Sequence, residues 1–276
     1  MGERDNARKW SERGEKIWRS VLGNEKYKLI EDGHFIKRRK LDGEIQRCAN
    51  LKRILPASEV FDKQELEPDS SEALPIVYRL INGKSELSLR TLEHLERLWN
   101  QDGYWDIGGY SRYNITSEPD SPGHWTFSAL FIARATLEAG EYGKVVRALD
   151  WMLRTYGGKG YIWPEYLDRN PELQRDCGFT PWTSYGELSM LFVFNMLGFH
   201  PKRDKIEITP NVLPGTKGLK AKVKFRGYMV SINLRGRGKP IRALMNGQEM
   251  KDISEEGISI SIPTSDANIE IFLEER

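Results

Sequence analysis

Cysteine is scarce in this chain. Among its 276 residues there are two cysteines, Cys48 and Cys177, which lie far apart and show neither a CxxC motif nor a Cys/His ligand spacing. A disulfide framework and a structural zinc site are therefore not expected, because both need clustered ligands or paired thiols. The simplest interpretation is a protein of a reducing compartment.

Long apolar runs are also missing. No apolar stretch approaches the roughly 20 residues that a membrane-spanning helix needs, and the charged opening segment, residues 1–5, is not followed by the apolar region of a signal peptide. From the sequence we expect a soluble, cytoplasmic protein without a membrane partner.

Neither sign of charge dominates. Charged residues make up 30% of the chain, yet the net charge is only +2, which argues against a nucleic-acid partner. The one basic run, residues 37–40, is interpreted as a solvated turn rather than a phosphate site. Ser184 lacks the GxSxG elbow of a serine hydrolase, and neither a Walker loop nor a dinucleotide fingerprint is present. His124 has no second ligand at metal spacing, so we predict no metal site and no cofactor.

Helical periodicity dominates the first two thirds of the chain. Apolar residues recur at helical spacing in six stretches, and the last of these is apolar nearly all round, so it should be buried. The stretches are Trp10 to Val21, Leu74 to Ile81, Leu89 to Trp99, Trp125 to Leu137, Val145 to Leu153 and Leu188 to Leu197. The three long connections, at about 24–70, 100–124 and 157–182, should fall at one end of an up-and-down helical arrangement, where binding and catalysis usually occur.

Strict alternation of apolar and polar residues replaces the helical spacing near residue 201. It is clearest from Tyr228 to Leu234, and Asn246-Gly247 is a strong hairpin-turn signal. We therefore predict a mainly α protein with two domains: a helical domain over residues 1–200 and an antiparallel β-sandwich over residues 201–276. The β domain should pack against the helices and carry no catalytic site, with a separate carbohydrate-binding module as the alternative.

Two of the long connections are rich in glycine and aromatic residues, and each leads into an apolar helix. They are residues 108–114 and 160–168, and this composition favours a sugar-binding cleft. Glu165 follows Trp163-Pro164 and precedes Tyr166, so its backbone is restrained by the proline and its carboxyl group has aromatic neighbours. Such neighbours desolvate a carboxyl group, as a general base requires. The alternative is an ordinary surface glutamate in a turn.

Arg112 lies between two tyrosines in the first of these loops. Its five fixed donors suit the vicinal hydroxyls of a sugar, although a structural ion pair is an equal alternative. The aromatic residues near these loops can stack on sugar faces or belong to the core; they are Trp105, Tyr110, Tyr113, Trp125, Trp163 and Trp182. The loop acids Asp106, Asp120 and Asp168 fit turn or helix-cap roles better than catalysis.

Taken together, these loops and five short motifs resemble glycoside hydrolase family 15, the glucoamylase and glucodextranase type of enzyme. The resemblance covers about residues 5 to 199, and it is specific in the combination and order of the motifs rather than in any one of them. The motifs are Asp69-Ser-Ser-Glu-Ala-Leu-Pro75, Gly108-Gly-Tyr-Ser-Arg-Tyr113, His124-Trp-Thr-Phe127, Gly160-Tyr-Ile-Trp-Pro-Glu-Tyr166 and Pro181-Trp-Thr-Ser-Tyr185.

The resemblance implies an (α/α)6 barrel and an inverting α-glycoside hydrolase acting on an oligosaccharide or α-glucoside. It implies that Glu165 is the general base that activates water. It also implies a glucose subsite, with Trp163 and Tyr166 flanking the base; the subsite residues are Arg112, Tyr113, Trp125 and Trp182. The β module looks more like the carboxy-terminal cap of rhamnosidases and disaccharide phosphorylases, so hydrolysis and phosphorolysis both stay open.

A family barrel has twelve helices, whereas six are expected here, equivalent to its second half. The family's general acid belongs to the other half. The first hypothesis is a split glycosidase whose acid comes from a separately encoded chain, which would also cover the apolar faces that half a barrel exposes. The second is a non-catalytic carbohydrate-binding protein, scaffold or relic fragment, with the open face covered in a homo-oligomer. A third option takes the acid from this chain, with Asp106 or Glu72 turned into the cleft.

Overall fold

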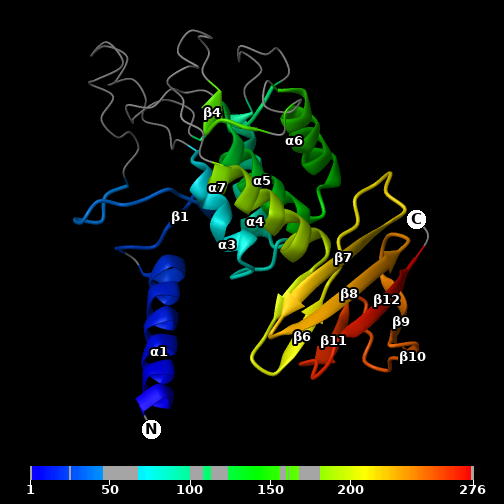
Figure 1. Cartoon of the computed structure of the whole chain (residues 1–276). Helices are drawn as coiled ribbons and strands as arrows, with labels where there is room; N and C mark the ends of the chain where they lie inside the picture. Colours follow the sequence, from blue (N-terminus) through cyan, green and yellow to red (C-terminus); the bar gives the residue numbers. More distant parts are fainter. Residues whose placement is uncertain are drawn as a thin grey trace. The chain divides into compact units, whose positions relative to one another are not determined.

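The computed structural model describes residues 2–24, 26–45, 68–99, 108–112, 124–155, 160, 162–167 and 181–274, without the side chains of residues 2, 3, 166 and 181–184. The chain divides into two compact units: Met1–Ile132 with Tyr166–Gly178, and Ala133–Glu165 with Phe179–Arg276. Both contain helices and antiparallel strand pairs, so the fold mixes α and β structure (Figure 1). No helix in the described ranges is both long and apolar enough to cross a membrane.

The first unit carries most of its core on short helices. Its elements are α1 (Gly2–Gly23), β1 (Ile30–Glu31), β2 (His34–Phe35), the 3-10 helix η2 (Ser70–Ala73), α3 (Leu74–Val77), α4 (Glu86–Leu95), the 3-10 helix η3 (Glu96–Leu98), β3 (His124–Trp125), the start of α5 (Thr126–Ala139) and β4 (Tyr166–Leu167). Asp69 caps η2, since its side chain accepts a hydrogen bond from Ser71 N–H while Glu72 reaches back to Asp69 N–H. Ser85 caps α4 with a single bond, because its side-chain oxygen accepts a hydrogen bond from Ser88 N–H.

Helix α3 is shorter than the apolar spacing predicts. It ends at Val77, because Arg79 adopts a left-handed conformation with φ of 54°. Arg79 N–H then bonds to Ile76 O and Leu80 N–H to Pro75 O, which is the hydrogen-bond pattern of a Schellman termination. The predicted helix over Leu74 to Ile81 was therefore wrong in its second half.

The second unit joins four helical segments to all of the carboxy-terminal strands. Its elements are the rest of α5, α6 (Tyr142–Arg154), α7 (Pro181–Met190), the π-helical segment η6 (Leu191–Met196), β5 (Phe199–Pro201), β6 (Lys205–Ile208), β7 (Gly218–Phe225), β8 (Tyr228–Arg235), β9 (Pro240–Met245), β10 (Gln248–Glu249), β11 (Ile258–Ser261) and β12 (Ala267–Leu273). The helix-to-strand change falls just before residue 200, and the predicted division into domains 1–200 and 201–276 stays a prediction.

The strands form a five-stranded sheet, in the order β10-β9-β12-β8-β7, and a three-stranded sheet, in the order β11-β6-β5. The hairpin predicted at Asn246-Gly247 is present between β9 and β10, with positive φ values of 51° and 80° at the two turn residues. The sheet departs from the purely antiparallel prediction in one respect, because β12 pairs with β8 in parallel. Alternation alone reports which face a residue occupies and not the direction of its neighbour.

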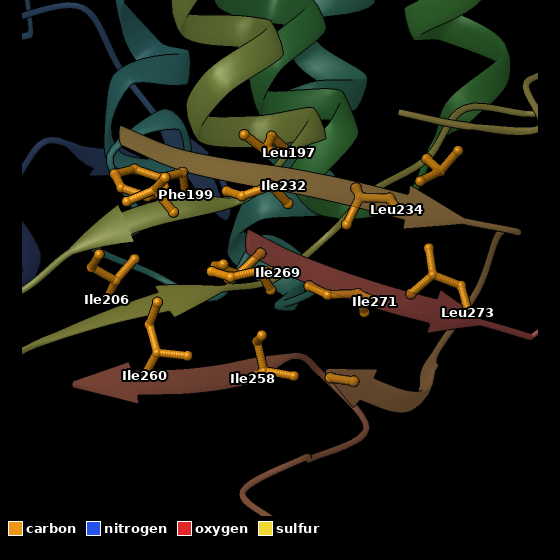
Figure 2. Packing of buried hydrophobic residues seen from close by; sticks show 14 residues of the cluster. Leu197, Phe199, Ile206, Ile232, Leu234, Ile258, Ile260, Ile269, Ile271 and Leu273 are labelled. Carbon is orange, nitrogen blue, oxygen red and sulfur yellow. The ribbon is translucent and has the colours of Figure 1, made fainter. Parts of the chain in front are cut away.

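The two sheets share one apolar core (Figure 2). Ile232 and Leu234 of β8 and Ile269 and Ile271 of β12 supply one side, and strands β5, β6 and β11 supply the other. Leu197, at the end of η6, belongs to the same core, so the last helix is anchored to the strands within this unit. Burial of these branched side chains supplies the main stabilising contribution, roughly 1.5–3 kcal/mol for each one.

The last helical stretch is buried along one face only. Leu191, Asn195 and Met196 are buried, whereas Met190 is 36% and Phe192 is 40% exposed. The expectation that the whole stretch is buried was therefore wrong, because only the face toward α5 and the strands is covered within the described structure.

Candidate functional site

The predicted site residues are only partly within the described structure. Tyr113, Asp106 and Asp120 lie outside it, and for Tyr166 and Trp182 the backbone is described but the side chain is not. Arg112 and Trp125 belong to the first unit, whereas Trp163 and Glu165 belong to the second, so each pair is described separately.

Arg112 lies against the aromatic start of α5. Its guanidinium carbon is 5.3 Å from the ring centre of Trp125 and 5.9 Å from that of Phe127. Its carbonyl accepts a hydrogen bond from Ser70 N–H at 2.9 Å, which ties the loop to the capped η2 segment. The guanidinium thus makes two cation–π contacts that hold its plane near these rings. Trp125 itself is 2% exposed, so its ring packs in the core of this unit.

A short two-stranded ladder pairs the segment that follows Glu165 with the segment that leads into α5. Strand β4 pairs with β3, with Tyr166 opposite Trp125 and Leu167 opposite His124. Trp125 N–H also bonds to Tyr110 O at 3.0 Å. The backbone residue that directly follows Glu165 is therefore held opposite Trp125.

Trp163 is fixed within the second unit. Its indole N–H donates to Met152 O at 2.9 Å, and its ring meets Tyr185 edge-on at 5.9 Å between centres. Trp163 and Pro164 are buried and Glu165 is half-buried. This tryptophan is a packed residue that positions the backbone leading into Glu165.

A cluster that the sequence did not reveal lies in the first unit. His34 of β2, Glu72 of η2 and His94 of α4 bring one ligand-type atom each to within 4.8 Å of one another. The imidazole rings of His34 and His94 are stacked, with centres 3.9 Å apart and planes 15° apart. Glu72 Oε2 lies 3.7 Å from His94 Nε2, and these side chains are 1% and 8% exposed.

Burial shifts both titrations in this cluster toward neutral forms. Desolvation raises the pKa of Glu72 well above its ordinary value, and the neighbouring Asp69 carboxylate raises it further. Desolvation lowers the pKa of His94 to about 3, with smaller contributions from His34 and Arg97. A neutral His94 imidazole and a Glu72 carboxyl group that favours its protonated form therefore lie beside the stacked His34 ring.

This burial bears on the option that Glu72 supplies the general acid. Its side chain is 1% exposed and one of its oxygens accepts a hydrogen bond from Asp69 N–H, so in the described structure its carboxyl group is shielded from solvent. The sequence held no signal for the cluster, because the three residues are far apart in the chain and show no ligand spacing. Only the turn at β1–β2 and the capped start of η2 bring them together.

The comparisons with known proteins do not add to this picture. No family model matches the sequence, and a search of curated proteins finds no match either.

Proposed function

We propose that this chain is a carbohydrate-active protein, the second half of a glucoamylase-like inverting α-glycoside hydrolase, with Glu165 as its general base. The observation that carries the proposal is the β3–β4 ladder, which holds Tyr166 opposite Trp125 next to the loop of Arg112. The segments that resemble the glycosidase motifs are thus joined by backbone pairing of β3 with β4 in a defined register, and not only by their order in the sequence.

Arg112 supports recognition of a sugar. Its guanidinium is held near two rings, and Ser70 fixes its backbone. A guanidinium restrained in this way loses little side-chain entropy on binding, and its planar fork of N–H groups has the geometry to bind a pair of neighbouring hydroxyls. Tyr113 and Trp182 complete the proposed subsite, while Trp163 supports the base from its packed position.

In the proposed reaction Glu165 accepts a proton from water as the water attacks the anomeric carbon. The bond to the leaving oxygen breaks while a general acid protonates that oxygen, and the configuration inverts. The two carboxyl groups must be roughly 6.5–9.5 Å apart for a water molecule to fit. The acid comes from a second chain that supplies the other helices of the barrel.

Exposed apolar side chains on two helices support a partner of this kind. Tyr185, Met190 and Phe192 on α7 and η6, and Val146 and Leu153 on α6, are exposed in the described structure. Tyr185 and Phe192 are about two helical turns apart, so they lie on the same face of the helix. Such faces are typical of contact surfaces.

The test is release of β-glucose from maltose, isomaltose, trehalose and a nitrophenyl α-glucoside by the purified chain. The chain is assayed alone and with the product of the gene immediately upstream. Glu165→Gln should abolish the activity, whereas Glu256→Gln, at an exposed turn, should leave it unchanged. Release of the α-anomer would contradict the inverting mechanism, and phosphate-dependent cleavage would indicate a phosphorylase.

The alternative is a sugar-binding protein or a relic without catalysis. Folded protein that binds these sugars but releases no glucose with any partner would favour it. Equal activity of the Glu165→Gln variant would exclude Glu165 as the base in either case.

A further inference from the structure

We propose that His34, Glu72 and His94 form a binding site for one divalent transition-metal ion of the zinc type. This site is independent of the proposed glycosidase function. The three side chains come from three separate elements of the first unit, and their candidate ligand atoms lie within 4.8 Å of one another. Two imidazoles and one carboxylate are a ligand set that zinc binds with a further position left for water.

Two of the ligand atoms have no hydrogen-bond partner among the residues that the structure describes. Glu72 Oε2 and His94 Nε2 are both buried and unbonded, and the 3.7 Å between them is too long for a hydrogen bond. Two ligands bound to one ion by bonds of about 2.1 Å at tetrahedral or wider angles are about 3.4–3.8 Å apart. The spacing therefore fits a bridging ion, which would satisfy both atoms at once.

The surrounding backbone orients the ligands. His34 Nδ1 lies 2.7 Å from Phe35 O, and because a carbonyl only accepts, this nitrogen carries the proton and leaves Nε2 as the electron-pair donor. Glu72 Oε1 accepts a hydrogen bond from Asp69 N–H, so Oε2 is the oxygen left for the ion. Hydrogen bonds of this kind, behind the ligands, are typical of built metal sites.

The stacking of the His34 and His94 rings means that one imidazole must rotate when an ion binds. An ion lies close to the plane of each imidazole that binds it, and two parallel rings with centres 3.9 Å apart do not share a plane. His34 is held by Phe35 O, whereas in the described part of the chain His94 Nε2 has no hydrogen-bond partner, so His94 is the ring expected to turn. Metal binding should thus be accompanied by loss of the His34–His94 stack.

The ion would join elements that are distant in sequence. His34 is on a two-residue strand, Glu72 is on a four-residue 3-10 helix, and His94 is on α4. Short elements of this kind have little stability alone, so a shared ion would stabilise their packing.

The experiment titrates the full-length, tag-free and chelator-treated chain with Zn²⁺ by calorimetry and with Co²⁺ by visible absorption. We expect one equivalent per chain, a Co²⁺ spectrum of tetrahedral type and a rise in Tm with Zn²⁺. Glu72→Gln and His94→Gln should each lose the equivalent, and His200→Gln, from a strand of the second unit, should keep it.

Failure of a variant to fold is separated from loss of binding by far-UV circular dichroism, and His34→Gln gives a third, independent removal of a ligand. No saturable binding by the folded wild-type chain would overturn the proposal. Binding that survives all three substitutions would overturn it as well. Neither result depends on whether the chain hydrolyses glycosides.

Discussion

Arg134 of α5 donates through Nε to Asn195 Oδ1 of η6 at 2.8 Å, and both residues are nearly fully buried. The same guanidinium pairs with Glu187 of α7, and Asn195 donates in turn to Glu138 Oε1 at 2.7 Å. This buried network holds the second half of α5 to the last helix within the second unit. A charge in such a position is stable only while its partners are present.

Replacing Arg134 with methionine should destabilise the protein strongly. The substitution leaves Glu187 and Asn195 without the donor that compensates their burial, so we expect a loss of about 3–5 kcal/mol in the free energy of unfolding. Urea denaturation followed by circular dichroism measures it. Arg154→Met is the matched control, because Arg154 makes an exposed i,i+4 pair with Asp150 and should change stability by less than about 0.5 kcal/mol. Similar losses in both variants would contradict the role of the buried network.

Gly198, which follows η6, should be intolerant of any side chain. Its φ is +71°, and a Cβ there would lie 2.0 Å from Thr209 O, whose own N–H bonds back to Gly198 O. Gly198→Ala combines left-handed strain with a backbone clash, so we expect it to cost more than about 3 kcal/mol.

Gly247 separates the two effects. It also has a positive φ, of +80°, but open space surrounds the position of its Cβ. Gly247→Ala should therefore cost only the conformational strain, about 1–2 kcal/mol. Equal midpoints for the two variants in urea denaturation would mean that the approach of Thr209 is not rigid.

The helical stretches and the Asn246-Gly247 hairpin could be located from the sequence, because both depend on local spacing. The end of α3 at Val77 could not, since it depends on Arg79 adopting a conformation that arginine rarely takes. The parallel pairing of β12 with β8 is likewise a tertiary choice that leaves no mark on alternation.

For the candidate site, the family resemblance assigned Arg112 and Trp125 to one sugar subsite; the structure describes a cation–π contact between them, and the subsite itself stays a prediction. The sequence held no sign of the cluster of His34, Glu72 and His94, because these residues are joined by packing and not by spacing. Long-range convergence of single residues is the part of a site that a single sequence does not encode in a readable pattern.

Stability of the metal-free protein should be highest between about pH 4.5 and pH 6.5, which are the ordinary pKa values of the Glu72 carboxyl group and the His94 imidazole. Desolvation lowers the pKa of His94 to about 3. Below pH 6.5 the unfolded chain therefore binds more protons than the folded chain, and stability falls as the pH falls. Desolvation and Asp69 raise the pKa of Glu72, so above pH 4.5 the folded chain holds the extra proton and stability falls as pH rises. His34 and Arg97 also face this pair.

Between those two values the opposite slopes offset each other, and outside them each pH unit changes the free energy of unfolding by up to about 1.4 kcal/mol. Denaturation in chelator from pH 3 to pH 9 measures the profile; Lys37 lies nearby, paired with Asp69. Glu72→Gln should remove the fall on the alkaline side, and His94→Gln the fall on the acid side. A profile unchanged in both variants would contradict the buried neutral pair.

Replacing Arg112 with lysine tests sugar recognition and rests on the proposed function. Lysine keeps the positive charge but loses the planar fork, so two neighbouring hydroxyls can no longer be held by one rigid group. Loss of one hydrogen bond to a charged donor corresponds to roughly a 10- to 100-fold rise in KM, with kcat changed less if the contact is made equally in ground and transition states. The measurement is steady-state hydrolysis of a nitrophenyl α-glucoside by the active assembly.

Arg226→Lys is the matched control for this substitution, because the Arg226 guanidinium also lies over an aromatic ring, 5.3 Å from the centre of Phe225, but on the β sheet. It should leave KM unchanged. If Arg112 is only a structural residue, its lysine variant should lower Tm through the lost contacts with Trp125 and Phe127 while KM stays the same. A raised KM with an unchanged Tm would instead indicate that the guanidinium contacts the substrate, since a role in packing alone would lower Tm and leave KM unchanged.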